Sequence, residues 1–178
     1  MRAYSRFFLP LFLSLLLFSC EKETPLASYF EYEITKYPVD TGMLEAYGKT
    51  DPGDAGYNFD ITLHSSGIIF DPVAETFSGY GNIVYLEMYS ASEASLEPGT
   101  YTFDNTGSGS PQTFDIGRFG MYVNMDEQSG TIVLANSGSV RVEKSGATWT
   151  LNISCTTSAG NPITGFYKGE LEYFDRTN

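Results

Sequence analysis

Histidine, cysteine and positive charge are scarce in this sequence. Its 178 residues contain one histidine, two cysteines and ten lysines plus arginines, against 22 aspartates plus glutamates, for a formal net charge of −12. One imidazole and two thiols cannot supply the usual zinc ligands, and a Ser/His/acid triad could use His64 alone as its base. Phosphate contacts to nucleic acid depend on lysine and arginine, so this composition argues against nucleic-acid binding. We expect no cofactor and no nucleic-acid partner.

A long apolar run occurs close to the N-terminus. Residues 7–18 are apolar apart from one serine, and they follow a basic start that contains Arg2 and Arg6. A membrane-spanning helix needs roughly 20 apolar residues, and Pro10 would strain it. A basic start followed by a short apolar stretch is the layout of a secretory signal. The sequence therefore predicts a signal peptide over residues 1–19.

The end of this run resembles the lipobox of bacterial lipoproteins. It reads Leu17-Phe18-Ser19-Cys20, an aliphatic residue and two small or tolerated residues before the cysteine that is modified. Phe18 and the following Glu21-Lys22-Glu23 resemble the looser box and the short surface-export tag of Bacteroidetes-type lipoproteins. This resemblance implies cleavage before Cys20, a lipid on its thiol, and a lipid-anchored outer-membrane protein on the cell surface or the periplasmic face.

The predicted anchor defines the organisation of the mature chain. Two or three acyl chains hold a protein on a membrane effectively permanently, so membrane lipid is the expected partner of acylated Cys20. Residues 20–28 are expected to be a tether and residues 29–178 a single domain. Cleavage removes two arginines and no acidic residue, so the net charge falls to −14. Cys155 is then the one free thiol, and an intrachain disulfide is excluded.

Beyond the anchor the sequence is typical of β-strands. In residues 148–155, Trp149, Leu151, Ile153 and Cys155 alternate with polar residues, which is the period of a half-buried strand. This alternation places the Cys155 side chain in the core, where free cysteine commonly packs as a small hydrophobe. Further strands are predicted at 30–37, 43–49, 57–64, 67–71, 82–89, 100–104, 113–117, 119–125, 130–135, 140–143 and 163–173.

Roughly ten to twelve short strands predict an all-β fold, a single antiparallel β-sandwich or β-barrel-like domain. Residues 105–112 are rich in glycine and serine and are expected to form a loop. Gly165 and Gly169 lie on one face of the last predicted strand, which favours a strand that coils around a nearly closed sheet.

A second resemblance involves turn-and-strand segments of this domain. Residues 96–101 (Leu-Glu-Pro-Gly-Thr-Tyr), 129–132 (Ser-Gly-Thr-Ile) and 160–171 are similar to the C-terminal half of small, uncharacterised Bacteroidetes lipoproteins. The similarity spans about half of the mature chain. That family has no assigned activity, so the resemblance implies no catalytic residue.

The most informative candidate surface is on the predicted strand 82–89. Tyr85, Glu87 and Tyr89 share one of its faces, while the other face is aliphatic. If the aliphatic face is core, the Tyr/Glu face is exposed, and exposed aromatics beside acids can stack sugars or contact a partner. The alternative is ordinary cross-strand packing of tyrosines on a sheet surface.

Other candidates for chemistry depend on less specific patterns. His64 is expected to face solvent, with Asp60 about 13 Å away along the strand. Acidic turns could contribute oxygen ligands to calcium, although neither has the spacing of a recognised calcium loop. No pair of carboxylates has a spacing that indicates glycoside hydrolysis. The calcium candidates are Asp51, Asp54, Asp126 and Glu127.

These observations favour a non-catalytic β domain that binds a glycan, a protein or a small ligand. The alternative is an accessory subunit of a cell-envelope assembly, and a third hypothesis is a hydrolase that uses acidic residues. An open aromatic groove or deep cavity would favour the binding module, and a flat face the accessory subunit.

Overall fold

A computed structural model describes residues 27–49, 53 and 55–177, and within these residues the chain forms strands, turns and loops. The predicted all-β class is confirmed. Thirteen strands are present in the described residues, one more than the upper end of the expected number. They are β1 (Tyr29–Tyr32), β2 (Thr35–Pro38), β3 (Thr41–Gly48), β4 (Tyr57–His64), β5 (Ile68–Asp71), β6 (Thr76–Ser90), β7 (Gly99–Phe103), β8 (Thr113–Asn124), β9 (Ser129–Leu134), β10 (Ser137–Ser145), β11 (Thr148–Thr156), β12 (Pro162–Gly169) and β13 (Glu172–Asp175).

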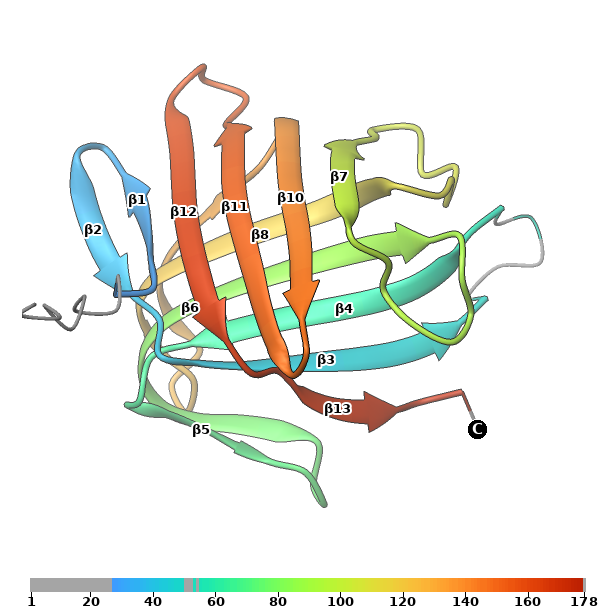
Figure 1. Cartoon of the computed structure of the whole chain (residues 1–178). Coiled ribbons are helices and arrows are strands. Elements are labelled where there is room, and N and C mark those ends of the chain that lie inside the picture. Colours follow the sequence, from blue (N-terminus) through green and yellow to red (C-terminus); the bar gives the residue numbers. More distant parts are fainter. Residues whose placement is uncertain (1–26, 50–52, 54, 178) are drawn as a thin grey trace, which may run out of the picture.

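The strands form one curled sheet in the order β13-β3-β4-β6-β8-β7-β10-β11-β12-β1-β2, with β5 paired to β6 and β9 to β8. Figure 1 shows the curl as two layers: β7, β10, β11 and β12 cross over β3, β4, β6 and β8. Most pairings are antiparallel, as expected. The β7–β8 and β13–β3 pairings are parallel, so the sheet is mixed and the prediction of a purely antiparallel sheet is wrong.

The short link between β9 and β10 carries the chain from one layer to the other. The Ala135 amide donates to Gly117 O in β8, and the next amide, of Asn136, donates to Thr156 O in β11. Just beyond, Gly138 has φ +118°, and a Cβ placed there would lie 2.2 Å from Ser154 O. Glycine is required at this position because the backbones of β10 and β11 approach too closely for a side chain.

The core lies between the two layers. Trp149, Leu151, Ile153 and Cys155 of β11 are all buried, which confirms the predicted inward face. Burial raises the pKa of the Cys155 thiol to about 12, so it is a packing group rather than a nucleophile. Further buried side chains from both layers are Phe30, Phe59, Ile61, Leu63, Val84, Leu86, Met88, Leu96, Tyr101, Phe114, Phe119, Val140, Val142, Ile163 and Tyr167.

Two predicted strands are interrupted. Residues 30–37 form the β1–β2 hairpin, because Glu33 (φ 49°) and Ile34 (φ 62°) take the left-handed conformation of a two-residue turn. The last predicted strand breaks after Gly169. The chain then leaves β12 and its final strand, β13, adds to the edge of β3. Elsewhere two predicted strands are one. The segments predicted at 113–117 and 119–125 form the single strand β8, which continues through irregular pairings with β6.

A pair of isoleucines tests the assignment of the core. Ile61 of β4 is fully buried and Ile69 of β5 is 64% exposed. We expect Ile61→Ala to lower the free energy of unfolding by about 2–5 kcal/mol, because it leaves a cavity in the core. Ile69→Ala should cost less than about 1 kcal/mol. Urea unfolding of the two variants measures the difference, and equal losses would contradict this placement of the core.

Candidate functional site

β4 is buried on both of its faces. Its inner side chains belong to the core, while Asn58, Asp60, Thr62 and His64 on its outer face are only 2–8% exposed. The expectation that His64 faces solvent is therefore wrong. Its ring packs at 6.0 Å from the ring of Phe77, and its Nδ1 lies 3.1 Å from a backbone carbonyl. A strand of this kind needs a partner for each polar side chain, since buried polar groups without hydrogen bonds are costly.

The β5–β6 hairpin and the C-terminal segment cover one part of this outer face. The Phe70 ring of the hairpin packs between two others, with its centroid 4.8 Å from that of Phe77 in the same hairpin and 5.5 Å from that of Phe174 in β13. Beside them, Arg176 donates to Glu45 of β3 at 3.0 Å and also pairs with a glutamate of the hairpin. This packing joins three separate segments over the ends of β3 and β4.

Three carboxylates lie side by side across the outer face. Glu45 of β3 is directly opposite Asp60 of β4, which is directly opposite Glu87 of β6. We call these three residues the acid row. Like charges in directly opposed positions of a sheet destabilise it. A row of this kind therefore works against stability and indicates a site.

Hydrogen bonds from neighbouring side chains make the acid row possible. Tyr85 OH donates to Asp60 Oδ2 at 2.6 Å, and the Asn58 amide donates to Asp60 Oδ1 at 3.2 Å. Tyr89 OH donates to Glu87 Oε1 at 3.1 Å. Asp60 thus has one donor from the neighbouring strand β6 and one from its own strand, Glu87 has a donor from its own strand, and Glu45 has a donor in Arg176.

Asp60 is the most perturbed acid of the row. Burial raises its pKa to about 7, the hydrogen bonds from Tyr85 and Asn58 oppose that rise, and the charges of Glu87 and Glu45 add to it. The pKa of Tyr85 is also raised, by burial and then by the charge of Asp60. The Asp60–Tyr85 pair consequently keeps a neutral form through the mildly acidic range.

Asp115 of β8 extends the acidic surface beyond Glu87. Its Oδ2 lies 3.4 Å from Tyr89 OH, a long contact, and its Oδ1 is buried without a hydrogen-bond donor among the described residues. Burial raises the pKa of this carboxyl as well. Asp115 therefore adds a fourth, partly buried carboxyl next to the acid row.

The three residues of the predicted surface, Tyr85, Glu87 and Tyr89, thus lie beside further acids that the prediction did not include. Tyr85 and Glu87 are half-buried, but Tyr89 is only 5% exposed, so the expected exposure is wrong for this residue. Sequence reasoning missed Glu45 and Asp115, and it considered Asp60 only as a partner of His64. The alternation in 57–64 was the available signal, since it puts Asp60 on the outer face, but the strand register was needed to place it beside Glu87.

An apolar groove adjoins the acid row on the same face. It has a volume of about 240 Å³ and lies over β6, β8 and β9. Polar atoms enter it from Thr62, Tyr85 and Arg118, and the Arg118 guanidinium lies 5.6 Å from the centre of the Tyr85 ring. Tyr85 therefore belongs to both the groove and the acid row. The apolar walls are Phe77, Ile83, Val123, Met125 and Ile132.

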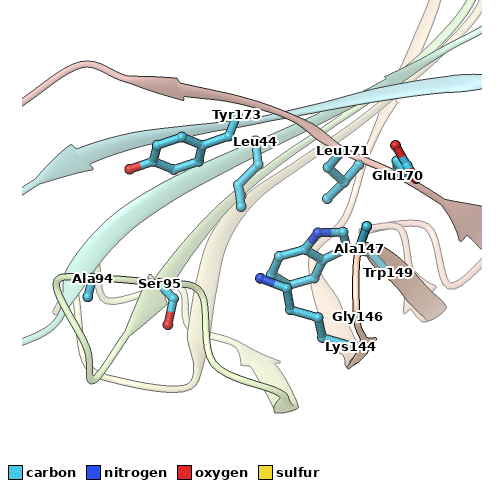
Figure 2. A pocket seen from close by; sticks show the side chains of 10 residues that line it. All are labelled: Leu44, Ala94, Ser95, Lys144, Gly146, Ala147, Trp149, Glu170, Leu171 and Tyr173. Atoms are coloured by element: carbon cyan, nitrogen blue, oxygen red, sulfur yellow. The ribbon is translucent and has the colours of Figure 1, made fainter.

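A second hollow of about 260 Å³ opens at the end of the space between the two layers. In Figure 2, Leu44 and Tyr173 lie on one side of it, and Lys144 and Trp149 lie on the other. Lys144 Nζ is 4.3 Å above the Trp149 ring. Because the lysine occupies this aromatic face and the indole is buried, the ring is not available to stack on a ligand.

The calcium candidates lie in two places. Asp51 and Asp54 fall outside the described residues, as does Cys20. Asp126 and Glu127 lie in the turn between β8 and β9, where Asp126 Oδ2 accepts from the Gly79 amide at 3.1 Å. Within the described part of the chain, no three histidine, cysteine or acidic side chains gather into a group that could hold a metal ion.

Comparisons with known proteins add no assignment. The chain matches no protein-family model, no curated protein and no solved structure. Over the residues that the structure describes, no helix is long and apolar enough to span a membrane.

The buried Asp60 gives stability a defined dependence on pH. A carboxyl whose pKa is higher in the folded protein than in the unfolded chain stabilises the fold fully at low pH and loses that contribution as pH rises through its folded value. We expect stability to fall between about pH 4 and pH 7 by on the order of 3 kcal/mol. In Asp60→Asn the amide can still accept from Tyr85, and most of this fall should disappear. Urea unfolding from pH 4.5 to 8 measures both slopes, and equal slopes would contradict the assignment.

Proposed function

We propose that this protein is a lipid-anchored exported lipoprotein whose β domain is a non-catalytic binding module. The binding site is the outer face of β3, β4, β6 and β8, and the ligand is rich in hydroxyl groups, as a glycan is. The acid row is the observation that carries the proposal. Anchorage is through acylated Cys20 in the outer membrane.

The chemistry of the face supports a hydroxyl-rich ligand. Ionised carboxylates are pure acceptors, and the donors they can recruit from a neutral ligand are hydroxyl and amide groups. Glu87 and Asp115, both half-buried, present such oxygens on this face. Tyr47, which is 37% exposed beside Glu45, adds an aromatic ring against which a sugar can pack.

Two alternatives make different demands on this face. An accessory subunit of an envelope assembly needs a broad contact surface, and the groove and acid row form a more structured site than such a role requires. A hydrolase would use Asp60 as a general acid, a role that its raised pKa favours. Turnover of a polysaccharide by the purified domain, lost in Asp60→Asn, would establish the hydrolase and overturn the binding module.

A pair of glutamates tests the site. Removing one charge-assisted hydrogen bond costs about 1.5–3 kcal/mol, so Glu87→Gln should weaken binding to a glycan found by array screening roughly 10- to 100-fold. Glu127→Gln removes the same charge from an exposed turn outside the site and should leave affinity unchanged. Isothermal titration at one ionic strength compares them. Equal affinities of the two variants would remove the acid row from the site.

The anchor is tested in cells. Cys20→Ala should release the protein from the membrane fraction, whereas Cys155→Ala should leave it membrane-bound, because the Cys155 thiol is buried in the core. Protease and antibody accessibility on intact cells then separates the cell surface from the periplasmic face. Continued membrane attachment of the Cys20→Ala protein would contradict lipidation at this residue.

A further inference from the structure

We propose that the ligand of this face is amphiphilic: an uncharged, hydroxyl-rich head on the acid row and an apolar chain in the adjoining groove. This inference rests on the proposed function and goes further, because it names a substituent that a simple glycan lacks. The residue that joins the two parts is Tyr85, which donates to Asp60 and lines the groove.

The register of the strands orders the outer face into successive rows. The acid row comes first, with Asp60 opposite Glu87. The next row places Tyr85 opposite Arg118. The third row is apolar and places Ile83 opposite Gly120, which is opposite Ile132 of β9. Polarity therefore changes along the strands from carboxylates to aliphatic side chains within two rows, a distance of roughly 13 Å.

The groove continues beyond its own lining residues. Its volume is about 240 Å³, and it shares Phe77, Val123, Met125 and Ile132 with an adjoining hollow of about 400 Å³. Ile132 on its wall is 57% exposed, although the chain as a whole carries a formal net charge of −12. Exposed apolar surface next to convergent polar groups is a recurrent mark of a binding site. An apolar chain that continues from a polar head fits both features.

The charges around Tyr85 select an uncharged head. Arg118 lies in the row between the groove and the acid row, and its guanidinium is exposed above the Tyr85 ring. An anionic head on the acid row would be repelled by Glu87 and Asp115, and a cationic head, although attracted by these acids, would also lie next to the Arg118 guanidinium of the adjoining row. Hydroxyl groups can donate to the carboxylates and accept from Arg118, so a neutral polyol satisfies both sides.

A series of alkyl β-glucosides tests the inference. The probes are methyl, butyl and hexyl β-glucoside below their micelle-forming concentrations, titrated into the mature chain carrying Cys20→Ala so that no lipid is attached. We expect affinity to rise at least tenfold from methyl to hexyl. Hexyl sulfate and hexylammonium, which carry the same chain on a charged head, should bind at least tenfold more weakly than hexyl β-glucoside.

Two residues of β9 provide a matched pair of variants. Ile132 lines the groove, whereas Leu134, 56% exposed on the same face, is not among the lining residues. Ile132→Ser should abolish the gain from the longer chain, and Leu134→Ser should preserve it. Thermal unfolding of both variants establishes that they are folded to the same extent before their affinities are compared.

The outcomes separate this inference from the proposed function. If glycans bind in a Glu87-dependent manner but chain length has no effect, the amphiphile is overturned while the binding module stands. If hexyl β-glucoside binds and Ile132→Ser does not weaken it, the groove is not the site of the chain. Equal binding of the charged-head probes, or chain-dependent binding that Glu87→Gln leaves unchanged, overturns the link between groove and acid row.

Discussion

The burial of Asp60 between two other acids is the constraint on which the outer face depends. A carboxyl in this position is tolerated only with donors close by, and the fold supplies them from the strands β4 and β6 and from the C-terminal segment. Tyr85 and Asn58 bond Asp60, while Arg176 holds Glu45 to one side. The same Arg176 fixes the β5–β6 hairpin over the face. Loss of any of these partners would leave a buried polar group unsatisfied, which is more costly than the bond itself contributes.

The acid row destabilises the fold, and the packing of side chains on the inner face of the same strands offsets this loss. Inward from Asp60, the neighbours Phe59 and Ile61 pack in a core to which both layers contribute. Each such side chain stabilises the fold by about 1.5–3 kcal/mol on burial. In β4, the inner side chains therefore stabilise the fold, whereas Asp60 on the outer face destabilises it. Proteins commonly break local rules of stability in this way where they bind or react.

How far the sequence predicts this molecule depends on which contacts a feature requires. The alternation from Trp149 to Cys155 is local, and it identified the inward face of β11 correctly. The acid row is not local: Glu45, Asp60 and Glu87 become neighbours only through the register of three strands. The burial of His64 likewise depends on a hairpin that folds back over it. The turn at Ile34 was missed because a β-branched residue is rarely left-handed, so its sequence favours a continuous strand.

The point where the chain enters the domain is compatible with a tethered binding module. Ser28 accepts from the Val39 amide through its carbonyl and from the Lys168 amide through its hydroxyl, so it lies against β12 and the corner that precedes β3. The groove and the acid row are centred on β6, in the layer that β12 crosses rather than joins, with the core between (Figure 1). In the proposed arrangement, a lipid attached ahead of Ser28 would connect to the domain beside β12 and the corner that precedes β3, and not through the groove or the acid row. Such an anchor would hold the protein at a membrane without using the side chains of the proposed binding face.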